Sequence, residues 1–280
     1  MKPQDIFIGM PVPANGYGVS RSGSDDRKSV TSRTIREYPH NKNFVILPYS
    51  HDPMYVDWSK EIVKQNAEQG GGMIFVGGEI WARNWQADSP YADINFSRKL
   101  HVIMGINEPD YPLVKKSFNP KGKRKFIYIG HNAWYKNPKE LENIAERMPQ
   151  YEFAHIGAGE IKGWKKLSTF ESLTPAFMTK LAREYDAYVS VSKSCPGTTA
   201  ILEQMCFGLV VAATPETGYE YSSLIKLSKD DTEFNTKALE DFQNADESDL
   251  FDRIKENRKV AKDLHNWERF TSSVIDFMGL

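Results

Sequence analysis

The sequence has few cysteines, no long apolar run and almost no net charge. Its 280 residues include only Cys195 and Cys206, which cannot build a disulfide framework and suit a reducing compartment. No apolar stretch approaches the ~20 residues of a membrane-spanning helix. The apolar run at the start of the chain is too short for a secretory signal. We therefore expect a cytoplasmic protein without a transmembrane segment. Peripheral contact with a membrane is compatible with this expectation.

The charges of the chain nearly cancel. There are 36 Lys and Arg residues against 37 Asp and Glu residues, which leaves a formal net charge of −1. No overall field attracts nucleic acid, so we expect no nucleic-acid partner, and any anion site must be local. The two cysteines have no nearby pair of histidines, which argues against a zinc site. A composition of 40% hydrophobic and 12% aromatic residues indicates a packed core rather than disorder.

Apolar runs alternate with segments of helical periodicity along most of the chain. We expect strands at 43–49, 73–78, 101–106, 125–130, 151–157, 186–192 and 209–214. We expect helices at 57–69, 138–148, 174–185 and 198–208, and from about residue 237 to the C-terminus. Before residue 43 the pattern is weaker, with one short strand-like run, IFIGM. This alternation predicts parallel sheets with helices on both faces, which bind ligands beyond the carboxyl ends of their strands.

A basic, proline-containing stretch marks the expected domain boundary. Residues 108–125, EPDYPLVKKSFNPKGKRK, carry three prolines and six basic residues between two apolar runs. We expect an N-terminal domain, a linker, a C-terminal domain and a final helix that can cross back to the first domain, over 1–112, 113–124, 125–265 and 266–280. About 110 residues before the linker is short for a domain. Either the first domain is reduced or the chain is a fragment.

The segment SVSKSCPGTTAILEQMCFG, residues 190–208, joins an expected strand to an expected helix. Thr198 and Thr199 fall at the helix N-terminus, where free N–H groups and the helix dipole attract phosphate. Gly197 allows the backbone a close approach to such a ligand. The alternative for the threonines is ordinary helix capping. Glu203, one turn further on, is either a solvated helix residue or a ligand for ribose hydroxyls.

A second stretch, KFIYIGHNAWYKNPKEL at 125–141, has a similar layout. The expected strand ends at Gly130, and Lys136 precedes the expected helix. From there the lysine can reach a diphosphate, although a single lysine before a helix is usually solvated. A third stretch, FAHIGAGEIKGW at 153–164, contains only G-x-G, which is too weak for a dinucleotide fingerprint and is more typical of a tight turn.

Together these pieces resemble the C-terminal, nucleotide-sugar-binding half of group 1 glycosyltransferases, which have the B-type fold of two Rossmann-like domains. The resemblance covers about residues 100–225 and loosely includes LPYSHDP and GGEIW before them. It implies an α/β protein of two Rossmann-like domains with a short or truncated first domain. The matching pieces occur in the family's order and are HVIMGINEPDYP, RKFIYIGHNAWYKN, FAHIGAGE, YDAYVSVS and PGTTAILEQMCFGLVVAATPETGY.

The resemblance implies a hexosyltransferase, generally retaining, that moves a hexose from a nucleoside-diphosphate sugar to a saccharide or a lipid- or protein-linked glycan. It gives Lys136 the role of neutralising the departing diphosphate and Glu203 that of binding ribose. No metal and no cofactor beyond the donor co-substrate is required, because the protein's own cations stabilise the leaving group. The other residues that it assigns to the donor site are Gly130, Asn137, Cys195, Gly197, Thr198 and Thr199.

Two positions depart from the family's pattern. The arginine expected five residues before Lys136 is His131, which can still take a catalytic role because a protonated histidine donates to phosphate. The glutamate expected eight residues before Glu203 is Cys195, which cannot accept sugar hydroxyls as a carboxylate does. These departures leave a non-catalytic nucleotide- or sugar-binding protein, or a degenerate glycosyltransferase, as the alternative. An unrelated doubly wound α/β protein is a third reading of the same pattern.

Overall fold

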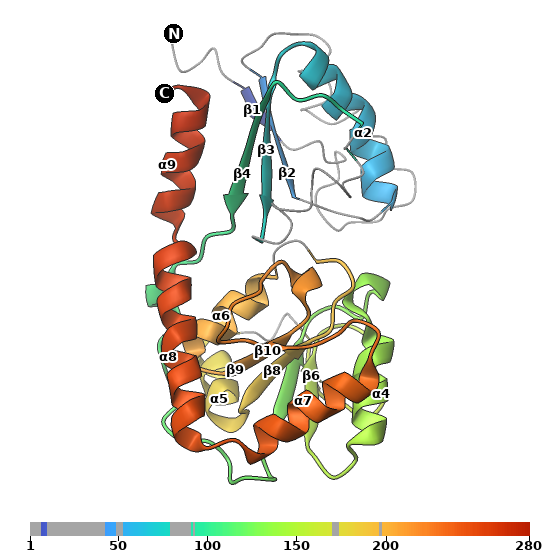
Figure 1. Cartoon of the computed structure of the whole chain (residues 1–280), viewed down its shortest axis with the longest axis vertical. Helices are drawn as coiled ribbons and strands as arrows, with labels where there is room; N and C mark the ends of the chain where they lie inside the picture. Colours follow the sequence, from blue (N-terminus) through green and yellow to red (C-terminus); the bar gives the residue numbers. More distant parts are fainter. Residues whose placement is uncertain are drawn as a thin grey trace. The chain divides into compact units, whose positions relative to one another are not determined.

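The computed structural model of the chain describes residues 7–9, 43–48, 53–78, 91, 93–169, 174–195 and 198–280. The chain divides into two compact units, Met1–Ile103 with Glu268–Leu280, and Met104–Trp267. Figure 1 colours both along the sequence. Gly197, one of the expected donor-site residues, lies outside the described residues.

The first unit contains a parallel sheet of four strands in sequence order. These are β1 (Phe7–Gly9), β2 (Asn43–Pro48), β3 (Gly72–Gly77) and β4 (Arg98–Ile103). The helix α2 (Pro53–Glu68) links β2 to β3 and ends at Gly70, whose positive φ of 73° is the left-handed conformation that terminates helices. The last helix, α9 (Trp267–Met278), packs Val274 and Met278 against Phe44 of the sheet.

The second unit contains a parallel sheet of six strands whose order is β7-β6-β5-β8-β9-β10. Numbered along the unit's own chain, this is the order 3-2-1-4-5-6 of doubly wound nucleotide-binding sheets. The order reverses between the neighbouring strands β5 and β8, so this pair forms the switch point. The strands are β5 (Phe126–Ile129), β6 (Phe153–Ile156), β7 (Lys165–Ser168), β8 (Ala187–Ser190), β9 (Val210–Ala213) and β10 (Ile225–Lys226).

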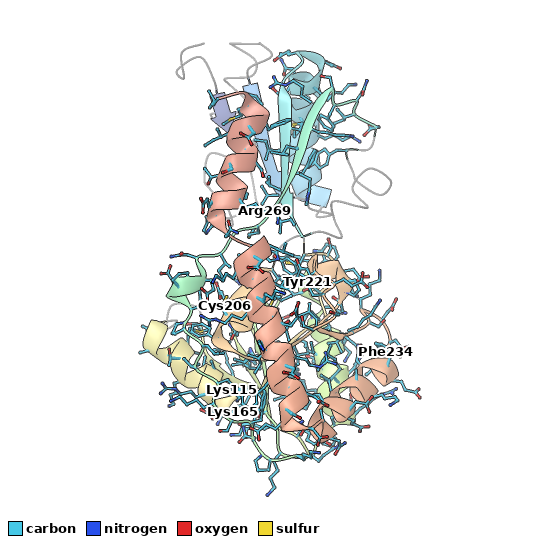
Figure 2. All side chains as sticks on the ribbon, turned by 60° about the vertical axis from the view of Figure 1, so that its left-hand side comes forward. Lys115, Lys165, Cys206, Tyr221, Phe234 and Arg269 are labelled. Atoms are coloured by element: carbon cyan, nitrogen blue, oxygen red, sulfur yellow. The ribbon has the colours of Figure 1, made fainter. Side chains whose placement is uncertain are left out.

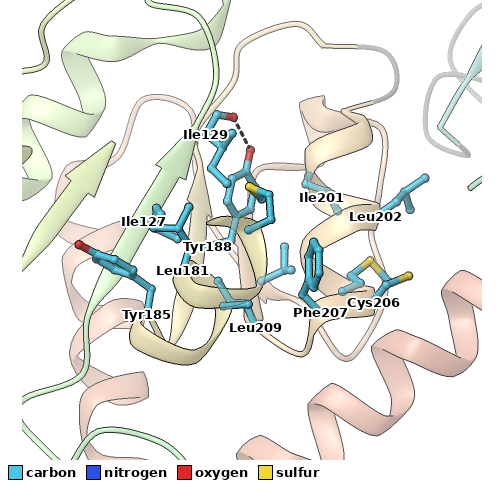
Figure 3. Close-up of a cluster of buried hydrophobic side chains, with 14 of the residues drawn as sticks. Ile127, Ile129, Leu181, Tyr185, Tyr188, Ile201, Leu202, Cys206, Phe207 and Leu209 are labelled. Carbon is cyan, nitrogen blue, oxygen red and sulfur yellow. Dashed lines mark hydrogen bonds between the residues drawn. The ribbon is translucent and has the colours of Figure 1, made fainter. Parts of the chain in front are cut away.

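Helices cover both faces of this sheet (Figure 1). Side chains alternate across each strand, so Ile127 and Ile129 of β5 pack towards α5 and α6, whereas Phe126 and Tyr128 pack towards α4 and α7. Figure 3 shows the first of these two cores, where the Tyr188 hydroxyl donates to the Ile129 carbonyl at 3.3 Å. The helices are α4 (Pro138–Arg147), α5 (Pro175–Glu184), α6 (Thr199–Phe207), α7 (Thr232–Asn244) and α8 (Glu247–Leu264).

The strands expected from apolar runs are confirmed, with ends that differ by up to three residues. Two strands at the edges of the second sheet were not expected from the sequence. β7 is an edge strand whose lysines, Lys165 and Lys166, face solvent, so no apolar alternation marks it. β10 has only two residues. α7 begins earlier than expected, because its first five residues, Thr232 to Thr236, contain a single apolar residue, Phe234.

Residues 113–124, which we expected to form a linker, belong to the second unit and make buried contacts within it. The Val114 N–H donates to the Phe207 carbonyl at 3.1 Å. The buried Lys115 ammonium, labelled in Figure 2, lies 2.7 Å from the Asp186 carboxylate. Arg124 is also buried, and its guanidinium donates to the carbonyl of Ala245 at 2.7 Å. The basic residues of this stretch therefore include buried residues that stabilise the fold as well as solvated side chains.

Candidate functional site

Two loops meet at the switch point of the second sheet. The loop after β5 runs from Gly130 to the start of α4, and the loop after β8 leads to α6. They are joined through the backbone, because the Lys193 N–H donates to the Tyr135 carbonyl at 2.8 Å. The two motifs that the sequence analysis singled out, some 60 residues apart along the chain, thus lie side by side at the carboxyl ends of the strands.

Lys136 and Cys195 are in direct contact across these loops. Lys136 ends the short 3-10 helix Trp134–Lys136, and its Nζ lies 2.7 Å from the Cys195 Sγ. The Thr198 hydroxyl donates to the same sulfur at 3.0 Å, and the Cys195 N–H donates to the Glu216 carbonyl at 2.9 Å. Among the described residues no carboxylate pairs with the Lys136 ammonium, so its charge is available to an anion.

The N-terminus of α6 faces the same place. Thr198 is the N-cap residue, but its side chain makes no capping hydrogen bond, because the hydroxyl is turned to Cys195. Thr199, the first residue of the helix, is exposed. Capping by the Thr198 hydroxyl is therefore not what the structure shows, and the positive end of the helix dipole lies beside the Lys136 ammonium.

Three other expected residues have local structural roles. An added Cβ at Gly130 would collide with the Tyr128 hydroxyl, which donates to the His131 carbonyl at 3.0 Å. His131 itself is exposed at the start of the loop. Asn137 has a left-handed backbone, with φ 58°, and its buried amide donates to the Lys229 carbonyl at 2.7 Å. The donor-binding roles of these three residues remain predictions.

Glu203 lines a pocket of about 220 Å³ on the side of α6. Burial raises the pKa of its carboxyl above the ordinary value. Neither Lys136 nor Cys195 belongs to the lining. The residue expected to bind ribose, Glu203, and the residue expected to bind diphosphate, Lys136, therefore lie on either side of the first turn of α6. The lining residues are Gly105, Ile106, Asn107, Asp110, Tyr111, Thr199, Leu202, Glu203 and Trp267.

Part of the pocket's lining comes from the segments that begin and end the second unit. The His265 ring contacts the Tyr221 hydroxyl at 2.7 Å and the Met104 carbonyl at 2.8 Å. Gly105 is needed here, because an added Cβ would lie 2.7 Å from the Trp267 indole. Asn107, Tyr111 and Trp267 were assigned no role from the sequence. For Asn107 and Tyr111 the available signal was the resemblance of HVIMGINEPDYP to the family's segment between domains.

Arg258 of α8 holds the turn that brings Tyr111 to the pocket. Arg258 pairs with Glu108 and donates to the carbonyls of Tyr111 at 3.2 Å and Cys206 at 2.6 Å. These contacts tie the 3-10 turn Glu108–Asp110 to the C-terminal end of α6. The position of Tyr111 in the pocket therefore depends on tertiary contacts with α6 and α8.

Two further findings concern the described part of the chain alone. In it, no three His, Cys, Asp or Glu side chains gather in a way that could hold a metal ion. Within the same residues, no helix combines the length and the apolar character that crossing a bilayer requires.

The chain matches no protein-family model and no curated protein sequence. Its fold is similar to that of a UDP-forming α,α-trehalose-phosphate synthase from Burkholderia xenovorans, solved with glucose-6-phosphate. The TM-score is 0.67 at 11% identity, over 89% of this chain and 71% of that one. A sucrose-phosphate synthase from Thermosynechococcus elongatus gives a TM-score of 0.57 at 12% identity, over 88% of this chain and 74% of the other.

A third similar structure is that of a point mutant of S. aureus TarM in complex with fondaparinux, α-GlcNAc-glycerol and UDP. The TM-score is 0.62 at 13% identity, and the match covers 89% of this chain but only 54% of TarM. At such identities the likeness shows the fold. The expected fold class, an α/β fold of two Rossmann-like domains of the glycosyltransferase B type, is confirmed.

Proposed function

We propose that this protein is a glycosyltransferase that moves a hexose from a nucleoside-diphosphate sugar to a saccharide or glycan acceptor. One observation carries the proposal. The Lys136 ammonium, which has no carboxylate partner among the described residues, lies beside the N-terminus of α6 at the switch point of the second sheet. A cation and a helix N-terminus together complement a diphosphate. Of the structures with the same fold, one is a complex with UDP and another is of a UDP-forming synthase.

The chemistry of such a transfer needs fixed donors at the leaving group. As the bond between sugar and diphosphate breaks, negative charge develops on the phosphate oxygen, and preorganised cations and N–H groups stabilise it. In the proposed mechanism Lys136 and the first turn of α6 take this role, and His131 adds a donor when protonated. The proposal draws on the protein's own groups and assigns no metal or resident cofactor. Retention of configuration is part of the proposal through the family resemblance.

Glu203 would bind the nucleoside side of the donor. Its carboxylate lines a pocket that also receives Thr199, the residue that follows the Lys136–Cys195–Thr198 contact in the chain. Hydroxyl groups of a ribose would donate to that carboxylate and offset the desolvation that raises its pKa. The diphosphate would then reach over the first turn of α6 towards Lys136.

A thermal-shift titration with the diphosphates of uridine, guanosine, adenosine and thymidine tests this proposal. A ligand that binds the folded state stabilises it by about 2.7 kcal/mol at a concentration a hundredfold above Kd, and this stabilisation raises the melting temperature. We expect one nucleotide to give a shift that Lys136→Met and Glu203→Gln reduce. Lys193→Met is the matched control, because Lys193 is an exposed lysine of the same loop pair. If none of the four nucleotides shifts the melting temperature, the proposal is wrong.

A specific observation favours a second candidate, a nucleotide- or sugar-binding protein without turnover. Cys195 stands where the family has a glutamate, and its sulfur is turned to Lys136 and Thr198. The two candidates differ in one measurement, the release of nucleoside diphosphate from the matching nucleotide-sugar in the presence of saccharide acceptors. Release that Lys136→Met abolishes identifies the transferase, and binding without release identifies the binding protein.

A further inference from the structure

The contact between Lys136 and Cys195 is unusually close for these two atoms. The distance of 2.7 Å between Nζ and Sγ is at the short end of the range for N–H···O bonds, about 2.7–3.2 Å, although sulfur is larger than oxygen. The two residues come from different loops and are 59 positions apart. The tertiary structure therefore holds an amine nitrogen at the sulfur, within reach of forming a bond.

Other contacts fix both partners in this arrangement. The Cys195 backbone is anchored by its N–H bond to the Glu216 carbonyl, and the Thr198 hydroxyl holds the sulfur from a second direction at 3.0 Å. On the other side, the Lys136 N–H donates to the Ala133 carbonyl at 2.9 Å, and the ammonium lies 5.6 Å from the centre of the Tyr135 ring. No described carboxylate draws the ammonium away from the sulfur.

We propose that Lys136 and Cys195 form a reversible covalent sulfur–nitrogen bridge when a hydroperoxide oxidises Cys195, and that this bridge disables the anion site. Cysteines that react with oxidants lie in electropositive, partly accessible surroundings. The group that contacts the Cys195 sulfur is a charged ammonium. Cys195 is buried except for 8% of its surface, so only a small oxidant can reach the sulfur.

Two steps give the bridge, and each balances. The thiol attacks the hydroperoxide, which forms a sulfenic acid and releases an alcohol, or water from hydrogen peroxide. The Lys136 ammonium then gives one proton to solvent, and the resulting amine attacks the sulfur. The S–N bond forms, the S–O bond breaks, and the sulfenic hydroxyl leaves as water with a second proton from the nitrogen. Sulfenic acids condense in this way with backbone nitrogen, and an amine held in contact is a better nucleophile. Two equivalents of an added thiol reverse the bridge, restoring the thiol and the ammonium and forming one disulfide.

The consequence for function rests on the proposed transferase. The bridged nitrogen has lost its positive charge and its freedom to point at a ligand. The site would then keep the N-terminus of α6 but lack the cation that complements a diphosphate. Oxidation is thus expected to weaken nucleotide binding while leaving the fold in place.

Peptide mapping by mass spectrometry after treatment with hydrogen peroxide tests the bridge itself. We expect a cross-linked pair of peptides, one with Lys136 and one with Cys195, lighter than their sum by two hydrogens and separated again by dithiothreitol. Cys195→Ser and Lys136→Met should each abolish the pair, and Lys193→Met, a lysine of the same loops, should not. Oxidation of Cys195 to sulfinic acid with no cross-link in the parent protein would overturn the proposal, and so would a cross-link that survives in Lys136→Met.

Cys206 supplies an internal control in the same sample. It is fully buried in α6, and burial raises the pKa of its thiol to about 12 (Figures 2 and 3). It should stay unmodified under conditions that convert Cys195. A circular dichroism spectrum of the treated sample shows whether the protein is still folded. Equal modification of both cysteines in a folded sample would mean that Cys195 is not a selective site and would contradict the proposal.

A second arm separates the bridge from the proposed function. The nucleotide that stabilises the reduced protein should bind the oxidised protein at least tenfold more weakly, as measured by its Kd, and dithiothreitol should restore the affinity. A fully cross-linked protein that binds as tightly as the reduced one would refute the switch. If no nucleotide binds even the reduced protein, the proposed transferase fails, while the mass measurement still decides whether the bridge forms.

Discussion

Glu203 shows how function and stability oppose each other at a single residue. Burial raises the pKa of its carboxyl, so the folded state disfavours the charged form. A carboxyl with a raised pKa lowers the stability of the fold above that pKa, and this loss disappears as the pH falls below the unfolded value of about 4.3. A residue that weakens the fold near neutral pH is expected where a bound ligand offsets the loss.

We therefore expect Glu203→Gln to increase the free energy of unfolding near neutral pH. The same variant should bind the nucleoside diphosphate about tenfold or more weakly, because hydrogen bonds to a charged group contribute about 1.5–3 kcal/mol. Urea unfolding at neutral pH and at about pH 3 measures the stability effect, which should vanish at the lower pH, where the carboxyl is protonated in both states. A variant that is less stable than the parent at neutral pH would show that the carboxylate has a stabilising partner.

Helix termini separate a structural from a ligand-binding role at the scale of the element. The N-cap of α7, Asp231, accepts a hydrogen bond from the Phe234 N–H at 2.9 Å. The N-cap of α6, Thr198, makes no such bond and turns its hydroxyl to Cys195. Both residue types favour helix starts in a sequence, so only the contacts distinguish the two ends.

Asp231→Ala should lower the free energy of unfolding by about 1 kcal/mol, because it removes the acceptor of a first-turn N–H group. Asp246→Ala is the matched control. Asp246 is the N-cap of α8, makes no capping bond and forms an exposed ion pair with Lys121, so its loss should lower the free energy of unfolding less than the loss of Asp231 does. Equal losses for the two variants, measured by urea unfolding, would contradict the distinction.

At the scale of the molecule, the described candidate site belongs entirely to the second unit. Lys136, Cys195 and Thr198 lie between Met104 and Trp267, and the lining of the Glu203 pocket lies within the same limits. The described core of the first unit is formed by side chains of β2, β3 and β4 with α9.

We therefore expect nucleotide binding to slow hydrogen exchange chiefly in the second unit. Protection should increase in residues 130–137 and 198–208, whose backbone lies at the candidate site, and change little in the sheet strands 43–48 and 72–77. Hydrogen–deuterium exchange with and without a saturating nucleoside diphosphate measures this. Protection confined to the first unit's strands would place the nucleotide elsewhere.

The sequence by itself determined most of the described elements and, through the family resemblance, the class of the fold. Apolar runs, helical periodicity and terminal signals such as Gly208, a left-handed C-cap with φ 93°, are local, so they are readable without the structure. It also singled out Lys136, just before an expected helix, and Glu203, one turn into another, and the family resemblance supplied the roles expected of them. The edge strand β7 escaped, because Lys165 and Lys166 follow no apolar pattern.

Only the tertiary structure decided which residues meet. Strand order places the loops after β5 and β8 together, and with them Lys136 and Cys195, 59 residues apart. It also buries Lys115 against Asp186, in a stretch whose composition indicated a solvated linker. Such contacts depend on the pairing of distant strands and on the packing of helices across them, and no local pattern encodes that pairing.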